Sequence, residues 1–320
     1  LYRFAGIDTV GFGPNGEAIK EEIPVNGGQW GLTQDDWGKV WFVNAGNETG
    51  PVHFQQHIIY GQFSAPNEHI GQYKVVWPIS NIPDTQGGPG QVRPDNTLNH
   101  FTATCGQDIF RGDRLPAELR GNLFFAEPVG RLVRRTLISV EDGITRLANA
   151  YEDQQSEFIR ATDPLFRPVN MVTAPDGTLY VVDMYRGIIQ QANWTREGTY
   201  LREQIKAHNL QYEIGRGRIY RVRHEDFEPG PQPRMLDETP AEWVQHLSHP
   251  NGWWRDTAQK LLVLRRDLSV VPALERLAEA DASDPRPRLH ALWTLDGLGA
   301  LDDALILRAL AAADPQVRMA

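Results

Sequence analysis

Alternating apolar and polar positions predict antiparallel β-strands over the first two thirds of the chain. The clearest pair covers residues 167–173 and 178–183. The turn between them, residues 175–177, is Pro-Asp-Gly, in which proline presets a negative φ and glycine supplies the positive φ of a tight turn. The second strand shows no polar face before Asp183, so we expect both of its sides to be buried within a stack of sheets.

Two earlier stretches, residues 30–44 and 101–127, repeat this pattern of strand, turn and strand. The turn glycines of the three units are Gly38, Gly121 and Gly177. Similar units at unequal spacing are typical of propeller blades with insertions, because radial repetition protects the edges of antiparallel sheets. We therefore expect residues 1–224 to form part of an all-β propeller, with its N-terminal blades missing.

A short helix is expected inside this strand-rich part. Residues 190–212 form an irregular excursion whose pattern is helical near residues 200–207. Residues 217–222 then alternate again as a strand does. We interpret the excursion as an insertion between two strands of one sheet.

The hydrophobic period changes from 2 to 3.6 residues beyond a Pro-rich linker at residues 225–236. Thr239 and Pro240 provide an N-cap and a first-turn proline for a helix. Prolines then recur at three places, Pro250, Pro285 and Pro315. Their spacing is somewhat shorter than the roughly 40 residues of HEAT repeats. We expect residues 237–320 to be a truncated, HEAT-like helical array.

Composition and charge exclude some partners. The 320 residues carry a formal net charge of −9 and show no basic face of the kind that binds phosphate backbones, so nucleic acid is not expected. No apolar run approaches the roughly 18 residues of a membrane span. The single cysteine, Cys105, excludes an intrachain disulfide and a CxxCH haem site within this sequence, and we expect it to be a small buried hydrophobe.

Both ends of the sequence interrupt a pattern. The chain starts within a strand pattern at residues 1–4 and stops within a helical pattern at residues 314–320. We therefore expect it to be a fragment of a longer protein, whose targeting signal would lie outside these residues.

Six motifs, taken in chain order, resemble one family of exported proteins. They are residues 35–43, 110–116, 127–135, 166–170, 175–186 and 217–222. Together they are similar to the membrane-bound dehydrogenase-like proteins of the PVC-type haem-binding CxxCH family. In that family, a propeller like that of glucose/sorbosone dehydrogenases is joined to HEAT-like repeats and a cytochrome c domain. The resemblance covers nearly the whole chain and implies a propeller of the soluble quinoprotein glucose dehydrogenase type.

The resemblance also implies an activity and cofactors. It implies an exported protein, periplasmic or at the cell surface, that oxidises a sugar or an alcohol and passes electrons to a c-type cytochrome. The implied cofactors are pyrroloquinoline quinone and calcium, with haem c in a domain outside this sequence. Quinoprotein sugar dehydrogenases place a catalytic histidine just before an Asn-Gly-Gly element. Here that element is residues 26–28 and the preceding residue is Val25, so the expected base is absent from that position.

A propeller would gather polar residues at one mouth of its channel, because innermost strands start there and second strands end there. Such residues orient a polar ligand and assist proton or hydride removal. The catalytic candidates are His100, Asp183 and Arg186, and the ligand-binding candidates are Gln29, Trp30, Asn44, Glu127, Arg167, Asn170 and Tyr185.

These candidates have structural alternatives. His100 is the best general base because the unperturbed pKa of histidine is close to neutrality. Asp183 alternatively ends its strand, and Arg167 and Arg186 alternatively pair with nearby aspartates. Glu127 together with Asp183 offers carboxylate oxygens that calcium accepts as ligands.

Three hypotheses about function follow. The first is a dehydrogenase-like protein that passes electrons to a cytochrome c, which the six motifs support. The second is a non-catalytic propeller that captures a carbohydrate or a protein, with the helical array as a docking platform, which the missing histidine at Val25 supports. The third is a lactonase-like hydrolase that uses Glu127 and Asp183 around calcium.

Overall fold

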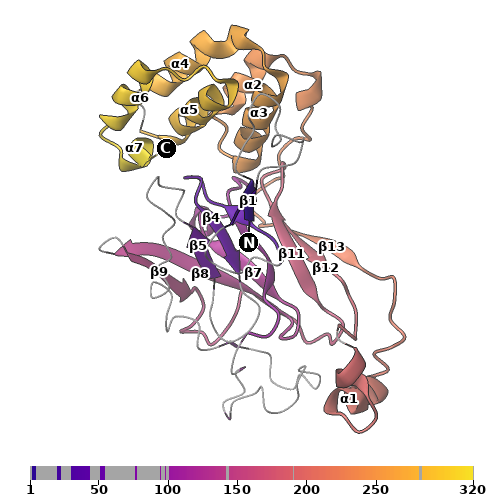
Figure 1. Ribbon diagram of the computed structural model, residues 1–320. Coiled ribbons are helices and arrows are strands. Elements are labelled where there is room, and N and C mark those ends of the chain that lie inside the picture. The colour runs from indigo at the N-terminus through magenta and orange to yellow at the C-terminus, as the bar shows by residue number, and fades with distance from the viewer. Residues whose placement is uncertain are drawn as a thin grey trace.

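The fold is taken from a computed structural model of the chain. It describes residues 2–4, 20–22, 30–43, 51–54, 76–77, 94, 98, 101–141, 144–189, 191–280 and 283–319. Strands dominate the first part of the described chain and helices the last, as Figure 1 shows.

The described strands form four antiparallel sheets. The first is β1 (Tyr2–Phe4) with β2 (Lys20–Glu22), and the second is β3 (Thr33–Gln34), β4 (Val40–Val43) and β5 (Pro51–Phe54). The third joins β6 (Cys105–Ile109), β7 (Leu123–Glu127), β8 (Leu132–Glu141), β9 (Ile144–Asn149) and β10 (Ile159–Arg160). The fourth is β11 (Pro168–Thr173), β12 (Leu179–Asp183) and β13 (Arg218–Val222).

The five-stranded sheet is the middle layer of a stack. Successive side chains of a strand point to opposite faces, and β7 uses both faces for packing. Leu123 and Phe125 of β7 share a core with Trp41 of β4. Phe124, between them, shares a second core with Val181 of β12. All five side chains are fully or almost fully buried.

Seven α-helices complete the described chain. They are α1 (Tyr200–His208), α2 (Pro240–His246), α3 (Gly252–Arg265), α4 (Val271–Glu279), α5 (Arg286–Leu298), α6 (Asp303–Leu310) and α7 (Pro315–Met319). Helices α2–α7 gather on one side of the strands, and α1 lies at the opposite end of the molecule (Figure 1). Within the described part of the chain, no helix combines the length and apolar composition needed to cross a membrane.

The expected all-β propeller is therefore wrong. The described strands make small separate sheets, none of which closes on itself, and the fold mixes these sheets with helices. The physical reason is that a hairpin pattern specifies which neighbouring strands pair, whereas the arrangement of whole sheets depends on packing between faces.

The central hairpin shows both the strength and the limit of the sequence pattern. Its turn is confirmed, with Gly177 at a φ of +81°. An added Cβ there would lie 2.3 Å from the Asp113 carboxylate, so glycine is also required for space. The expected burial of both faces of β12 is only half right, because Val181 is buried and Val182 is partly exposed. The strand that is buried on both faces is β7.

The predicted helix signals are confirmed locally. The expected helix in the 190–212 excursion is α1. Thr239 and Glu242 form a capping box at the start of α2, in which the Thr239 N–H donates to Glu242 Oε2 at 2.7 Å. Helices α3 and α5 begin just beyond Pro250 and Pro285. One continuous hydrophobic core, which includes Leu262, joins the helices from α2 to α7.

We expect Leu262→Ala to destabilise the protein by about 2–5 kcal/mol, because it removes a buried side chain and leaves a cavity. Leu264, two residues further along α3, is the matched control: Leu262 is 1% exposed and Leu264 is 69% exposed. Leu264→Ala should change the free energy of unfolding by no more than about 0.5 kcal/mol. Urea unfolding measures both. Equal losses for the two variants would contradict this packing of α3.

Candidate functional site

Three of the sequence-predicted site residues lie outside the described residues: Gln29, Asn44 and His100. The described candidates come partly together around Arg167. Its side chain donates from Nη1 to the Pro128 carbonyl at 2.7 Å and from Nε to the Arg186 carbonyl at 3.0 Å. Its backbone N–H donates to Asp183 Oδ1 at 2.7 Å. Arg167 is buried, so it clamps these chain segments to one another by backbone hydrogen bonds.

The Glu127 carboxylate is held in the same manner. It is fully buried, and Oε1 accepts hydrogen bonds from the N–H groups of Thr102 and Ala103, both at 2.7 Å. Oε2 accepts from Gly130 N–H at 2.6 Å. These donors occupy the positions that a cation would need, so Glu127 does not fit the role of a calcium ligand. The described residues contain no group of three or more His, Cys, Asp or Glu side chains that could hold a metal ion.

Asp183 caps the end of β12. Its Oδ1 accepts from the N–H groups of Arg167 and Tyr185, both at 2.7 Å. The side chain is buried, and Oδ2 has no hydrogen-bond partner within the described residues. This geometry matches the strand-end alternative, in which the carboxylate stabilises the backbone at Tyr185, a residue with a positive φ of +46°.

The other described candidates face different directions. Trp30 is 55% exposed. Asn170 is exposed, and its side-chain oxygen accepts from the N–H of the next residue, Met171, at 2.8 Å. Tyr185 packs against the guanidinium of Arg218, 3.5 Å from the ring centre. They do not line the cleft described next.

A cleft of about 430 Å³ lies between the strand layers and helix α3. It is lined by Leu32, Thr33, Gln34, Val40, Asp108, Ile109, Arg111, Val172, Thr173, Trp253 and Asp256. These residues come from β3 and the residue before it, from β4, β6, β11 and α3, and from the segment after β6. Small-molecule sites combine apolar and aromatic walls with a few polar groups that orient the ligand, and this lining contains both kinds of side chain.

Asp108 is the titratable group at the centre of this cleft. Its Oδ2 accepts from the Thr173 hydroxyl at 2.6 Å and from the Thr173 N–H at 2.7 Å, and its Oδ1 accepts from the Thr33 hydroxyl at 3.2 Å. Burial raises the pKa of Asp108 to about 6, against the lowering effect of the Thr173 and Thr33 hydrogen bonds and of the Arg111 charge. Asp108 therefore changes protonation near neutral pH, as a proton-transfer group must.

Arg111 forms the second side of the cleft and links the strands to the helices. Its Nη1 and Nη2 bind the Asp256 carboxylate of α3 at 2.6 and 2.9 Å. Its Nε binds Asp36 Oδ1 at 2.5 Å. Arg255 of α3 and Arg286 of α5 also bind Asp36. Burial alone would raise the pKa of Asp36, but Arg111, Arg255 and Arg286 lower it to about 2.

His290 of α5 lies behind this cluster. It is buried, its Nδ1 is 2.7 Å from the Gln259 side-chain oxygen, and its Nε2 is 3.9 Å from Asp256 Oδ1. Burial, opposed by the Asp256 charge and reinforced by the Arg255 charge, lowers the pKa of His290 to about 3. The ring is therefore neutral at physiological pH and does not add charge to the cluster.

Sequence reasoning missed the residues of this cleft. Asp36 and Arg111 stand inside two of the motifs that carry the family resemblance, residues 35–43 and 110–116. Those motifs indicated that the two residues matter to the family, although they did not indicate a role for either residue. Asp108 stands within a mostly buried strand, between Gln107 and Ile109, and a carboxylate is uncommon in such a strand. That position was a signal for a functional group.

The fold and the cleft define a protein in which stacked sheets pack against a group of helices. A titratable carboxyl, Asp108, lies in the cleft where the strands meet α3, which we call the seam. The chain belongs to the family described as "Domain of unknown function (DUF7133)", whose model matches residues 5–226. The match includes Asp36, Asp108 and Arg111, and it ends before the helices α2–α7. No curated protein and no solved structure matches the chain.

We expect Arg111→Met to destabilise the protein by about 3–5 kcal/mol, because it leaves the carboxylates of Asp36 and Asp256 without their main counter-charge. Arg223, which pairs with Glu228 on the surface, is the control, and Arg223→Met should cost no more than about 1 kcal/mol. Urea unfolding gives the free energies. Limited proteolysis within residues 225–236 should become faster in the Arg111 variant, because the strands and helices are held together less firmly. It should not become faster in the Arg223 variant. Unchanged proteolysis and stability would show that this cluster does not hold strands and helices together.

Proposed function

We propose that the chain binds a hydroxylated small molecule, a sugar or a polyol, in the cleft between the strands and α3. The observation that carries the proposal is the convergence of Asp108, Thr33 and Thr173 with the Arg111–Asp256 pair in one cleft. Hydroxyl groups both donate and accept hydrogen bonds, so they match a site that offers carboxylate acceptors, guanidinium donors and hydroxyls together.

The apolar part of the cleft supports the same class of ligand. Trp253 of α3 is partly buried at the edge of the cleft, and Leu32 and Val172 expose about half of their side chains there. A flat aromatic ring packs well against the C–H face of a sugar ring, while the hydroxyls around that ring reach the polar groups. The size of the cleft, about 430 Å³, suits a ligand of one or two sugar units.

The family resemblance supplies the wider setting of the proposal. A sugar or an alcohol is the substrate that the resemblance implies, so the proposed ligand agrees with it. Export to the periplasm or the cell surface, and partnership with a c-type cytochrome or a haem c domain outside this sequence, are parts of the same proposal. The carbohydrate-binding alternative needs neither a cytochrome nor a quinone.

Oxidation of the bound hydroxyl is a second candidate function, and the pKa of Asp108 favours it. A carboxylate with a pKa of about 6 is largely ionised at neutral pH, which is the state in which it serves as a general base for a reacting hydroxyl. Oxidation of an alcohol to a carbonyl releases two electrons and a second proton, and the resemblance implies a quinone and then a cytochrome as their acceptors. The three N–H donors to Glu127 compete with a calcium ion for its oxygens, so no step is assigned to that cofactor.

Calorimetric titration with a panel of neutral monosaccharides and polyols tests the binding. Asp108→Asn should weaken binding about tenfold, because it removes a charged acceptor of a ligand hydroxyl. In the unchanged protein, binding should weaken as pH falls through about 6, where Asp108 becomes protonated. Trp253→Leu, which keeps an apolar side chain but removes the flat ring, should also weaken it. Asp303→Asn, an exposed change on α6, is the control and should bind normally.

Two outcomes would contradict this site. One is binding that both cleft variants leave unchanged, which would place the ligand elsewhere. The other is the absence of binding across the panel while all variants keep the stability of the parent protein. A pH dependence that persists in Asp108→Asn would assign the titration to another group.

Dye reduction separates the two candidate functions. If the protein oxidises its ligand, a soluble electron acceptor should be reduced in the presence of the ligands that bind, and the rate should rise as pH increases through about 6. Asp108→Asn should lower the rate of dye reduction by a factor of at least about ten, and Asp303→Asn should leave that rate unchanged. The dye assay is run with pyrroloquinoline quinone and calcium present. If ligands bind but no dye is reduced, oxidation is ruled out and only the binding function is supported.

A further inference from the structure

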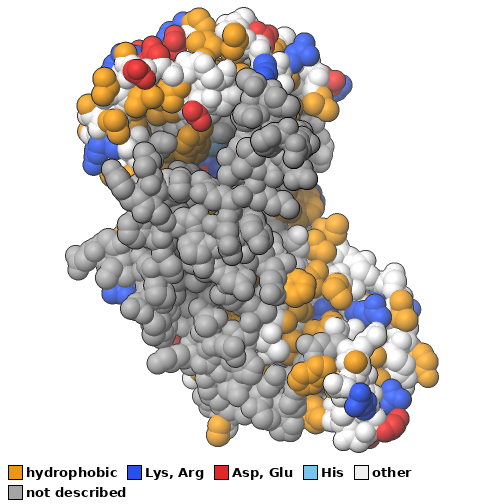
Figure 2. All heavy atoms as spheres, viewed as in Figure 1, with side chains coloured by type: hydrophobic (Ala, Val, Ile, Leu, Met, Phe, Trp, Pro, Cys, Tyr) orange, Lys and Arg blue, Asp and Glu red, His pale blue; other side chains and the backbone are white. Residues whose placement is uncertain are grey.

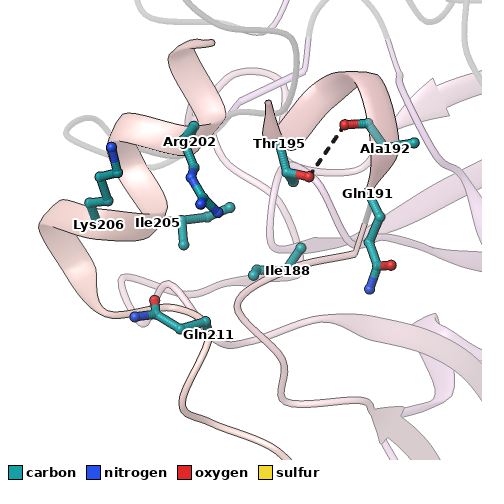
Figure 3. Close-up of a pocket in the computed structure, with 8 residues that line it drawn as sticks. All are labelled: Ile188, Gln191, Ala192, Thr195, Arg202, Ile205, Lys206 and Gln211. Carbon is teal, nitrogen blue, oxygen red and sulfur yellow. Dashed lines mark hydrogen bonds between the residues drawn. The ribbon is translucent and has the colours of Figure 1, made fainter. Parts of the chain in front are cut away.

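The excursion between β12 and β13 encloses a second cavity, of about 400 Å³. It is lined by Ile188, Gln191, Ala192, Thr195, Arg202, Ile205, Lys206 and Gln211. Helix α1 forms one wall, and the turn that carries Ala192 and Thr195 forms another (Figure 3). Because α1 lies at the opposite end of the molecule from α3, this cavity is separate from the cleft at the seam (Figure 1).

The apolar face of α1 determines which of its side chains line the cavity. Leu201 and Ile205, four residues apart, are buried and pack with Leu210 and Ile188. Residues three or four apart lie on one face of a helix, so Arg202 and Lys206 form a second row beside the apolar one. Basic side chains are correspondingly exposed over the region of α1 in Figure 2, in a chain whose net charge is −9.

Two exposed carboxylates pair with these cations. Arg202 Nε lies 3.1 Å from Glu197 Oε1, and Lys206 Nζ lies 2.8 Å from Glu197 Oε2 and 3.5 Å from Glu203 Oε1. Both carboxylates are exposed, and neither residue lines the cavity. An anion in the cavity therefore competes with carboxylates that water already solvates, which are weaker competitors than buried partners.

The cavity also contains an acceptor that lacks a donor. The side-chain oxygen of Gln211 is buried and has no hydrogen-bond partner among the residues that the structure describes. Buried acceptors are normally satisfied, and a ligand hydroxyl is the donor that fits a carbonyl oxygen. Gln191 and the Thr195 hydroxyl add further polar groups on the same lining.

We propose that this cavity binds a small hydroxylated anion, a sugar acid or a sugar phosphate. The anionic group lies beside Arg202 and Lys206, and a ligand hydroxyl donates to Gln211. Guanidinium and ammonium groups make the strongest hydrogen bonds to carboxylate and phosphate oxygens. The cavity volume is within the usual range for small-molecule sites. The proposal does not depend on ligand binding at the seam.

Calorimetric titration of the full chain with galacturonate, galactose 1-phosphate and galactose tests it. Either anionic sugar should bind, with an affinity that falls as salt is added, and the neutral sugar should not bind at this cavity. The tighter of the two anions identifies the source of the charge. The double variant Arg202→Gln with Lys206→Gln should weaken anion binding by about tenfold or more. Both side chains are substantially exposed, so the variant should fold normally.

Glu197→Gln should change the affinity for the anion in the opposite direction from the double variant. It removes one of the two competing carboxylates, so anion binding should become tighter. Arg216→Gln removes an exposed arginine that pairs with Glu213 outside the cavity, and it should leave anion binding unchanged. The proposal is overturned if neither anion binds, if the double variant weakens galactose binding as much as galacturonate binding, or if the double variant binds the anions as the parent does. Equal weakening by Arg216→Gln would also overturn it, because the effect would then come from overall charge.

Discussion

The ionic contact of Arg111 with Asp36 and Asp256 is the constraint on which the arrangement of strands and helices depends. A charged group can be buried only with a partner of opposite charge and with its hydrogen bonds satisfied. Arg111 meets this condition only when α3 lies directly over the end of β6. Gly252 at the start of α3 allows that approach, since an added Cβ would lie 2.7 Å from Arg111 Nε. The ion cluster therefore needs a glycine as much as it needs charges.

The central hairpin fixes the same helix from the other side. Trp254 Nε1 donates to the Pro175 carbonyl at 2.8 Å, and Asn251 Nδ2 donates to the Ala174 carbonyl at 2.9 Å. The turn between β11 and β12 and the charges beside β6 thus hold the first turns of α3 at two places. The cleft with Asp108 lies between these attachments, so its shape follows from them. A change in either attachment should alter the cleft even though no cleft residue has changed.

Local features of the fold could be predicted from the sequence, and long-range ones could not. The turn at Gly177 and the capping box at Thr239 depend on a few adjacent residues, whose conformational preferences are strong. The propeller was wrong because the described strands form small separate sheets packed together with helices, and no local pattern specifies how whole sheets pack. The site was missed for the same reason. Arg111 and Asp256 are 145 residues apart, and each is an ordinary charged residue in its own segment.

The two cavities differ in charge, and this difference decides what each one selects. At the seam, the arginines Arg111, Arg255 and Arg286 face the aspartates Asp36, Asp256 and Asp284. Asp108, whose pKa is raised to about 6, adds a further negative charge when it is ionised, so the cleft does not favour an anion and attracts a neutral ligand through hydrogen bonds and shape. At α1, Arg202 and Lys206 pair with two exposed carboxylates, Glu197 and Glu203, and of these four charged residues only the two cations line the cavity. Because water screens exposed charges strongly, the two cations act on an anion only at short range. They therefore select an anion that enters the cavity, and this selection does not require the protein as a whole to be basic.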